Sequence, residues 1–172
     1  MAMHRMTFAL AAALCLGSRA VAAPFDGQWS VTWKCQRQPG DESAPCAYGQ
    51  DDSFQLYLRA SGENICGFHF ASMQRGNHID EGDQLDGKPT ITGIVRGDVA
   101  DLHWRSAWGG QGTATIRLRG NEIDWTIDDS SGRSALPRHE ILIRQRAGAS
   151  QFESRLLAAV PAADCKFSHG KP

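Results

Sequence analysis

The stretch "TATIRLRGNEIDWTID", residues 113–128, has the clearest strand pattern in the chain. Apolar and polar side chains alternate along it, and Gly120-Asn121 interrupts the alternation in the middle. A period of two is the pattern of a β-strand with one buried face. A Gly-Asn pair tolerates the positive φ angles that a two-residue hairpin turn requires. The stretch therefore predicts two antiparallel strands joined by a tight turn.

The same alternation recurs along most of the chain. Besides 112–119 and 121–128, it covers residues 25–35, 53–60, 63–70, 90–95, 98–107 and 138–146. A sheet with one apolar face closes on itself or packs on a second sheet, because a flat one leaves two exposed edges. We therefore predict an all-β protein in which an eight-stranded antiparallel meander closes into a barrel.

One helix is predicted after the last strand. Ser150 and Glu153 have the spacing of a capping box, and Pro161 helps to end the helix. The apolar residues fall at helical spacing: Phe152, Leu156, Leu157 and Val160. We expect this stripe to pack on the core, with a partner-binding face as the alternative.

Residues 1–22 have the pattern of a signal peptide. Arg5 precedes a short apolar run, and Ala20-Val21-Ala22 forms a small-x-small cleavage site. The run is shorter than the roughly 20 residues that span a bilayer. The order of these features disfavours a buried N-terminal helix, and Leu14 disfavours a lipoprotein anchored at Cys15. We expect cleavage after Ala22, which leaves residues 23–172 as one periplasmic or secreted domain.

The remaining chain is weakly acidic. Without Arg5 and Arg19, the 18 basic residues fall to 16 against 19 acidic ones, a net charge of −3. Both signs are interspersed and form no basic patch, which argues against nucleic acid as a partner. No later segment is apolar enough to span a membrane.

Four cysteines remain in this domain: Cys35, Cys46, Cys66 and Cys165. An even number in an oxidising compartment favours two disulfides. Three connectivities are possible. We favour Cys35–Cys46, which closes a short polar loop, together with Cys66–Cys165, which ties down the C-terminal tail. Zinc is the alternative, disfavoured because there is no C-x-x-C pair.

The sequence contains no local metal or nucleophile motif. No two histidines have metal-ligand spacing; His69 shares a strand face with Ile65, and His103 lies on a polar face, so both suggest structural or surface histidines. The acidic run 80–83 does not match a calcium loop and suggests a solvated loop. There is no Gly-x-Ser-x-Gly motif. We expect no metal, no cofactor and no enzymatic activity.

Three loops are better candidates for binding. Residues 71–89, which include His78 and Asp80, are long for a connection and imply a missed short element or a functional loop. Trp108 lies beside a glycine-rich hairpin tip, where it could contact a partner or cover one end of the core. Arg133, in loop 129–137, could reach an acidic cleft on another protein, although a solvated arginine is the default.

Gly27-x-Trp29 on the first strand, the eight meander strands and the following helix together resemble the lipocalin or calycin architecture. The resemblance implies that Trp29 packs against an arginine near the end of the barrel, Arg144 or Arg146. It also implies that Cys66 and Cys165 tie the tail to the barrel wall, and that the barrel carries a small apolar ligand.

Two functions are therefore expected. The first is an exported, non-enzymatic protein that binds or inhibits another protein through loops 71–89 and 129–137. The alternative is a lipocalin-like carrier of a small apolar ligand. Small residues such as Gly67 and Gly93 could leave a cavity for such a ligand, but inward tryptophans would fill the barrel. Those tryptophans are Trp29, Trp33, Trp104 and Trp125.

Overall fold

The structure of this protein is a computed structural model that describes residues 24–34, 51–74, 76–81, 88–146 and 165. These residues form nine strands: β1 (Gly27–Trp33), β2 (Asp52–Ser61), β3 (Asn64–Met73), β4 (His78–Asp80), β5 (Ile91–Arg96), β6 (Val99–Arg105), β7 (Gln111–Arg119), β8 (Glu122–Ser131) and β9 (His139–Arg144). The signal peptide predicted at 1–22, Cys35, Cys46 and the helix predicted at 150–161 lie outside the described residues. Within the described ranges, no helix has the length and apolar character needed to cross a membrane.

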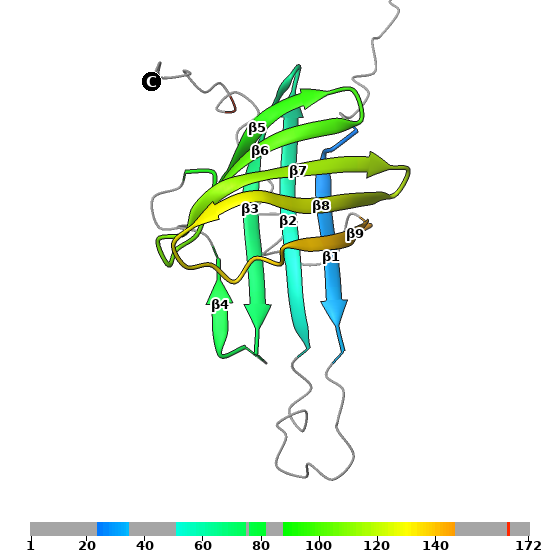
Figure 1. The fold of residues 1–172 in the computed structure, drawn as a ribbon. Helices are drawn as coiled ribbons and strands as arrows, with labels where there is room; N and C mark the ends of the chain where they lie inside the picture. Colours follow the sequence, from blue (N-terminus) through cyan, green and yellow to red (C-terminus); the bar gives the residue numbers. More distant parts are fainter. Residues whose placement is uncertain (1–23, 35–50, 75, 82–87, 147–164, 166–172) are drawn as a thin grey trace, which may run out of the picture.

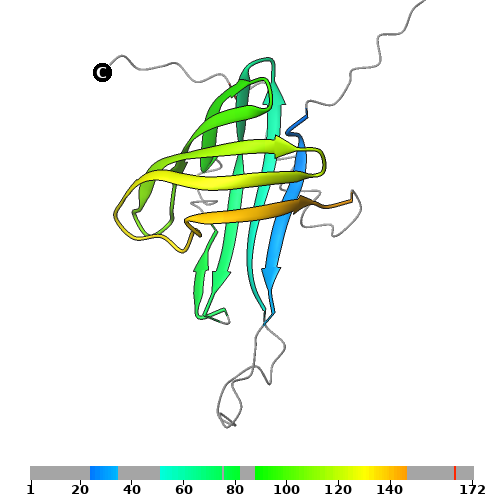
Figure 2. The ribbon, with the colours of Figure 1, turned by 45° about the vertical axis from the view of Figure 1, so that its right-hand side comes forward.

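Eight of these strands form a closed antiparallel barrel, as predicted. β1 pairs with β2 on one side and with β9 on the other, so the meander returns to its start. β5–β9 cross in front of β1–β3 at a steep angle, as Figure 1 and Figure 2 show. Among the described strands, β4 pairs only with the end of β3. It is the short element missed within residues 71–89.

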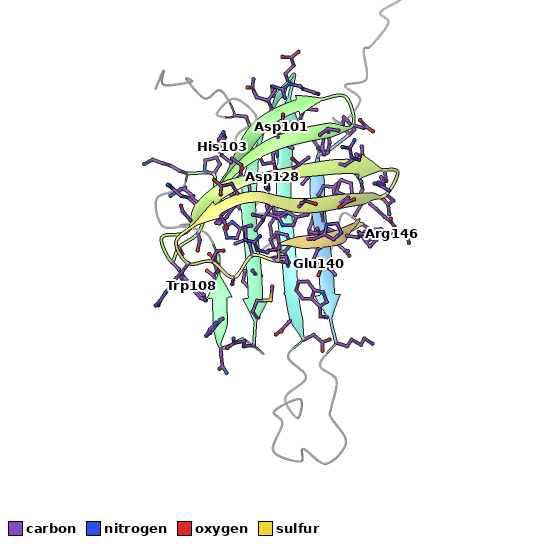
Figure 3. The ribbon with its side chains drawn as sticks, viewed as in Figure 1. Asp101, His103, Trp108, Asp128, Glu140 and Arg146 are labelled. Atoms are coloured by element: carbon purple, nitrogen blue, oxygen red, sulfur yellow. A yellow bond between two sulfur atoms is a disulfide. The ribbon has the colours of Figure 1, made fainter. Side chains whose placement is uncertain are left out.

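The interior of the barrel is filled by one apolar cluster. Trp29 and Trp125 are completely buried in it, and Trp104 is nearly so. Trp33 is only half-buried and packs against the edge of the cluster. Polar residues of the same strands face outward, such as Asp101, His103 and Asp128 in Figure 3. The alternation in the sequence thus separates the inner face of the wall from the outer one.

Glycines in the wall bring neighbouring strands together instead of leaving space for a ligand. A Cβ atom on Gly67 would lie 1.9 Å from the carbonyl oxygen of Tyr57, and one on Gly93 would lie 2.1 Å from that of Asp101. The space beside both glycines is therefore occupied by backbone of the adjacent strand.

Trp29 on β1 and Arg144 on β9 pair where the first and last strands of the barrel meet. Cζ of Arg144 lies 4.1 Å from the centre of the Trp29 ring, a cation–π contact. The guanidinium also donates to the carbonyl oxygens of Asp26 and Pro24, and the Trp29 indole donates to Phe25 O over 3.0 Å. Arg144 therefore makes the contact that the resemblance implies, while Arg146 is exposed.

The described part of the C-terminal tail is fixed to the outer wall by a disulfide. Cys66 on β3 is bonded to Cys165, with their Cα atoms 5.4 Å apart. Both cysteines are buried in a small cluster with Phe68, separate from the barrel interior. This pairing is the one favoured from the sequence, and it is consistent with an oxidising compartment.

Candidate functional site at the barrel mouth

Three segments far apart in the sequence meet at one end of the barrel, which we call the mouth. They are β4, the turn 106–110 between β6 and β7, and the loop 132–138 between β8 and β9 (Figure 1). A single buried carboxylate holds them together.

That carboxylate belongs to Asp80, the last residue of β4, whose side chain is completely buried. Ser106 Oγ donates to Oδ2 over 2.6 Å, and the backbone NH of Ala135 donates to the same oxygen over 3.2 Å. The backbone NH of Ala107 and Nε2 of His69 each lie 3.2 Å from Oδ1. The turn and the loop thus both hydrogen-bond to a side chain of β4, because an ionised carboxylate can accept several bonds.

His69 connects this network to the barrel wall. It is completely buried on β3. Its Nε2 must carry the hydrogen of this bond, because an ionised carboxylate accepts hydrogen bonds and cannot donate them. On the other side of the ring, Nδ1 lies 3.0 Å from Oγ1 of Thr90, which also accepts the backbone NH of His69 over 3.1 Å. The ring is therefore fixed from both sides.

The environment of Asp80 stabilises its ionised form. Burial by itself raises the pKa of the carboxyl group. The hydrogen bonds from His69 and Ser106, the electrostatic attraction of His69 and the NH of Ala135 outweigh burial, so that the pKa lies far below its usual value. The interpretation of residues 80–83 as a solvated acidic loop is therefore wrong for Asp80, which is buried and bonded to His69. No local pattern in the sequence shows that Asp80 ends a strand facing His69.

The turn 106–110 is fixed to the loop 132–138 by close backbone contacts. Ser106 Oγ accepts the NH of Trp108 over 3.0 Å while donating to Asp80. Gly109 pairs with Arg133 in an isolated parallel bridge. A Cβ atom on Gly110 would lie 2.2 Å from the carbonyl oxygen of Arg133, so only glycine permits this approach.

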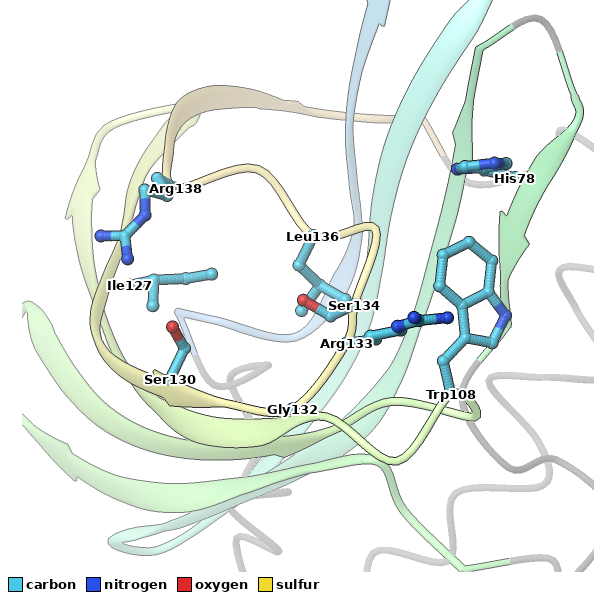
Figure 4. A pocket seen from close by; sticks show the side chains of 9 residues that line it. All are labelled: His78, Trp108, Ile127, Ser130, Gly132, Arg133, Ser134, Leu136 and Arg138. Atoms are coloured by element: carbon cyan, nitrogen blue, oxygen red, sulfur yellow. The ribbon is translucent and has the colours of Figure 1, made fainter.

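The mouth contains a pocket of about 760 Å³. Its lining residues are His78, Trp108, Ile127, Ser130, Gly132, Arg133, Ser134, Leu136 and Arg138, shown in Figure 4. The rings of His78 and Trp108 meet edge to face, with their centres 5.3 Å apart. Arg133 extends toward Trp108 on one side of the pocket, and Arg138 lies with Ile127 on the opposite side (Figure 4).

The described lining of the pocket is positively charged. Arg133 and Arg138 are both exposed, and neither guanidinium makes an ion pair or a hydrogen bond with the residues that the structure describes. Among the described residues, no carboxylate lines the pocket, and the nearby Asp80 accepts bonds from several donors. Two unpaired cations in a concave site favour an anionic ligand.

The structure brings the four candidate binding residues of the sequence together. His78, Trp108 and Arg133 line one pocket, and Asp80 lies behind it, bonded to Ser106 and Ala135. Trp108 is 38 % exposed and stands at the rim, outside the core cluster. Neither the structural role of Ser106 nor the lining role of Arg138 was predicted from the sequence. For His69, the signal was available: a polar residue on the apolar face of its strand needs a buried partner.

A second pocket, of about 420 Å³, lies on the outer wall. It includes Thr92, His103, Thr113 and Asp129, which form one row across β5–β8. His103 thus lies at the surface, as its polar face predicts.

The buried polar network does not have the arrangement of a catalytic triad. In a triad, histidine lies between the nucleophile and the carboxylate and accepts the proton of the nucleophile. Here Asp80 lies between Ser106 and His69, and the hydroxyl donates to the carboxylate. Among the described residues, no three His, Cys, Asp or Glu side chains are grouped so that they could hold a metal ion. The network therefore has the geometry of a structural clasp for the mouth.

Comparisons of this chain with protein-family models, with curated proteins and with solved structures find no match. The function proposed for this chain therefore rests on the geometry of the mouth.

Proposed function

We propose that this chain is an exported, non-enzymatic binding protein that binds another protein through the barrel mouth. The observation that carries this proposal is the clasp: the buried carboxylate of Asp80 on β4 binds both the turn 106–110 and the loop 132–138, and these two segments present Trp108 and Arg133 side by side. Tryptophan and arginine contribute most to binding energy at many protein interfaces. A surface that is already fixed also loses little conformational entropy on binding.

The second candidate, a carrier of a small apolar ligand, is supported by the size of the mouth pocket. A volume of about 760 Å³ falls within the range of roughly 300–1,000 Å³ typical of small-molecule sites. The barrel interior is occupied by the core cluster, so such a ligand would bind at the mouth. Unpaired arginines in the lining make an entirely apolar ligand the weaker candidate.

Native mass spectrometry of the protein, isolated unreduced from the exported fraction of its host, tests both candidates. A stoichiometric protein companion that is lost in Trp108→Ala but kept in Ile141→Ala would support the proposal. Ile141 is the matched control because it is 50 % exposed on the outer face of β9, away from the mouth. An adduct of small mass in place of a companion would instead support the carrier.

A further inference from the structure

The charge of the mouth pocket contrasts with that of the whole chain. The chain has a net charge of −1, yet the described pocket lining has two arginines and no acidic residue. Arg133 and Arg138 stand on opposite sides of the pocket, and neither has a partner among the described residues (Figure 4). An arginine that only increased solubility would not need to line a concave site.

The remaining lining divides into hydrogen-bond donors and apolar surface. The hydroxyl groups of Ser130 and Ser134 can donate to an anion bound between the arginines. The apolar part consists of Ile127, Leu136 and the Trp108 ring, which His78 supports from the side. A free inorganic ion would use the charged groups and leave this apolar surface wet.

We propose that the mouth pocket binds a carboxylate attached to an aromatic or branched apolar group. Arg133 or Arg138 binds the carboxylate with two parallel N–H···O bonds, a geometry that guanidinium groups favour. The apolar group packs on Trp108 and Leu136. This inference rests on the proposed function, because it names the chemistry by which the mouth recognises its partner. The carboxylate can belong to an acidic side chain of a protein or to a free organic acid.

Titration with defined probes, followed by the indole N–H signal of Trp108 in ¹H–¹⁵N NMR spectra, tests the chemistry directly. The signal is assigned with Trp108→Phe. A blocked tripeptide of alanine, glutamate and phenylalanine represents the protein source, and N-acetylphenylalanine represents the free acid. Their neutral counterparts, with glutamine and with a terminal amide, keep the shape and remove the charge. Inorganic phosphate supplies an anion without an apolar group.

We expect saturable shifts with at least one carboxylate probe, and binding at least roughly ten-fold weaker for its neutral counterpart and for phosphate. The tighter of the two carboxylate probes identifies the source. Arg133→Gln or Arg138→Gln should weaken binding of the carboxylate probe by about ten-fold. Arg117→Gln is the matched control, since Arg117 is exposed on the outer face of β7, and it should leave binding unchanged.

Equal binding of acid and neutral probes, or no saturable shift with any probe at concentrations of tens of millimolar, would overturn the inference. These results are distinct from failure of the proposed function. A protein companion that is lost in Trp108→Ala but kept in both arginine variants would leave the proposed function standing and exclude the carboxylate site. Carboxylate binding without any protein companion would support the carboxylate site and count against the proposed function.

Discussion

Nε2 of His69 lies 3.2 Å from Oδ1 of Asp80, and both side chains are completely buried at the mouth of the barrel. This contact joins the barrel wall to β4, a strand of three residues that pairs with no described strand other than β3. Through Asp80 it also joins the wall to the turn 106–110 and the loop 132–138. The position of the candidate binding residues therefore depends on one polar pair.

Asp80→Asn should lower the free energy of unfolding by about 2–4 kcal/mol. An asparagine keeps one acceptor oxygen but turns an NH₂ group toward donors, which leaves buried donors such as Ala135 N unsatisfied at roughly 1–3 kcal/mol each. Urea denaturation measures the loss. Asp98→Asn, on an exposed turn, removes the same charge and should change stability by less than about 0.5 kcal/mol. Equal effects of the two variants would mean that Asp80 is not a clasp.

The contribution of Asp80 to stability should depend on pH in one direction. Its pKa is lowered on folding by hydrogen bonds that outweigh burial, so the contribution is complete above the unfolded pKa of about 3.9 and falls as the carboxylate is protonated. The difference in unfolding free energy between the wild type and Asp80→Asn should therefore shrink as pH falls from 6 toward 2. Denaturation curves across that range measure it, and a constant difference would contradict the lowered pKa.

Arg144→Ala should lower the free energy of unfolding by about 1–2 kcal/mol. The substitution removes the cation–π contact with Trp29 and two hydrogen bonds to backbone carbonyls. Arg144→Lys keeps the charge but not the planar fork, so an intermediate loss is expected. Thermal unfolding measures both. Arg146→Ala is the control; a loss as large as that of Arg144→Ala would show that charge alone matters in this part of the barrel.

Cys165→Ser should lower the free energy of unfolding by about 2–4 kcal/mol, because the bridge to Cys66 constrains the unfolded chain. The double variant with Cys66→Ser should lose little more than the single one, since the two cysteines act through one bond. Denaturation without reductant measures both variants. A loss in the double variant about twice that of Cys165→Ser would mean that each cysteine contributes through packing instead of through the bridge.

The strand pattern was sufficient to predict the barrel, whereas the mouth required contacts that no local pattern encodes. Alternation in residues such as Ile116 and Ile123 is local, because each strand has one buried face. The partners of Asp80 lie up to 55 residues away in the sequence. Trp108, Arg133 and His78 could be selected as loop residues of suitable chemistry, but only the closed barrel shows that they line the same pocket.

Gly110→Ala should disturb the mouth without altering any charge in it. A Cβ atom there would lie 2.2 Å from the carbonyl oxygen of Arg133, so the turn 106–110 and the loop 132–138 must move apart. We expect a shift of the Trp108 indole N–H signal and a stability loss of about 1–3 kcal/mol. Gly62→Ala is the control: its φ of 62° makes alanine strained, but nothing lies within 4 Å. That variant should lose stability with the Trp108 signal unmoved, whereas an unmoved signal in Gly110→Ala would mean that the two mouth segments are not coupled.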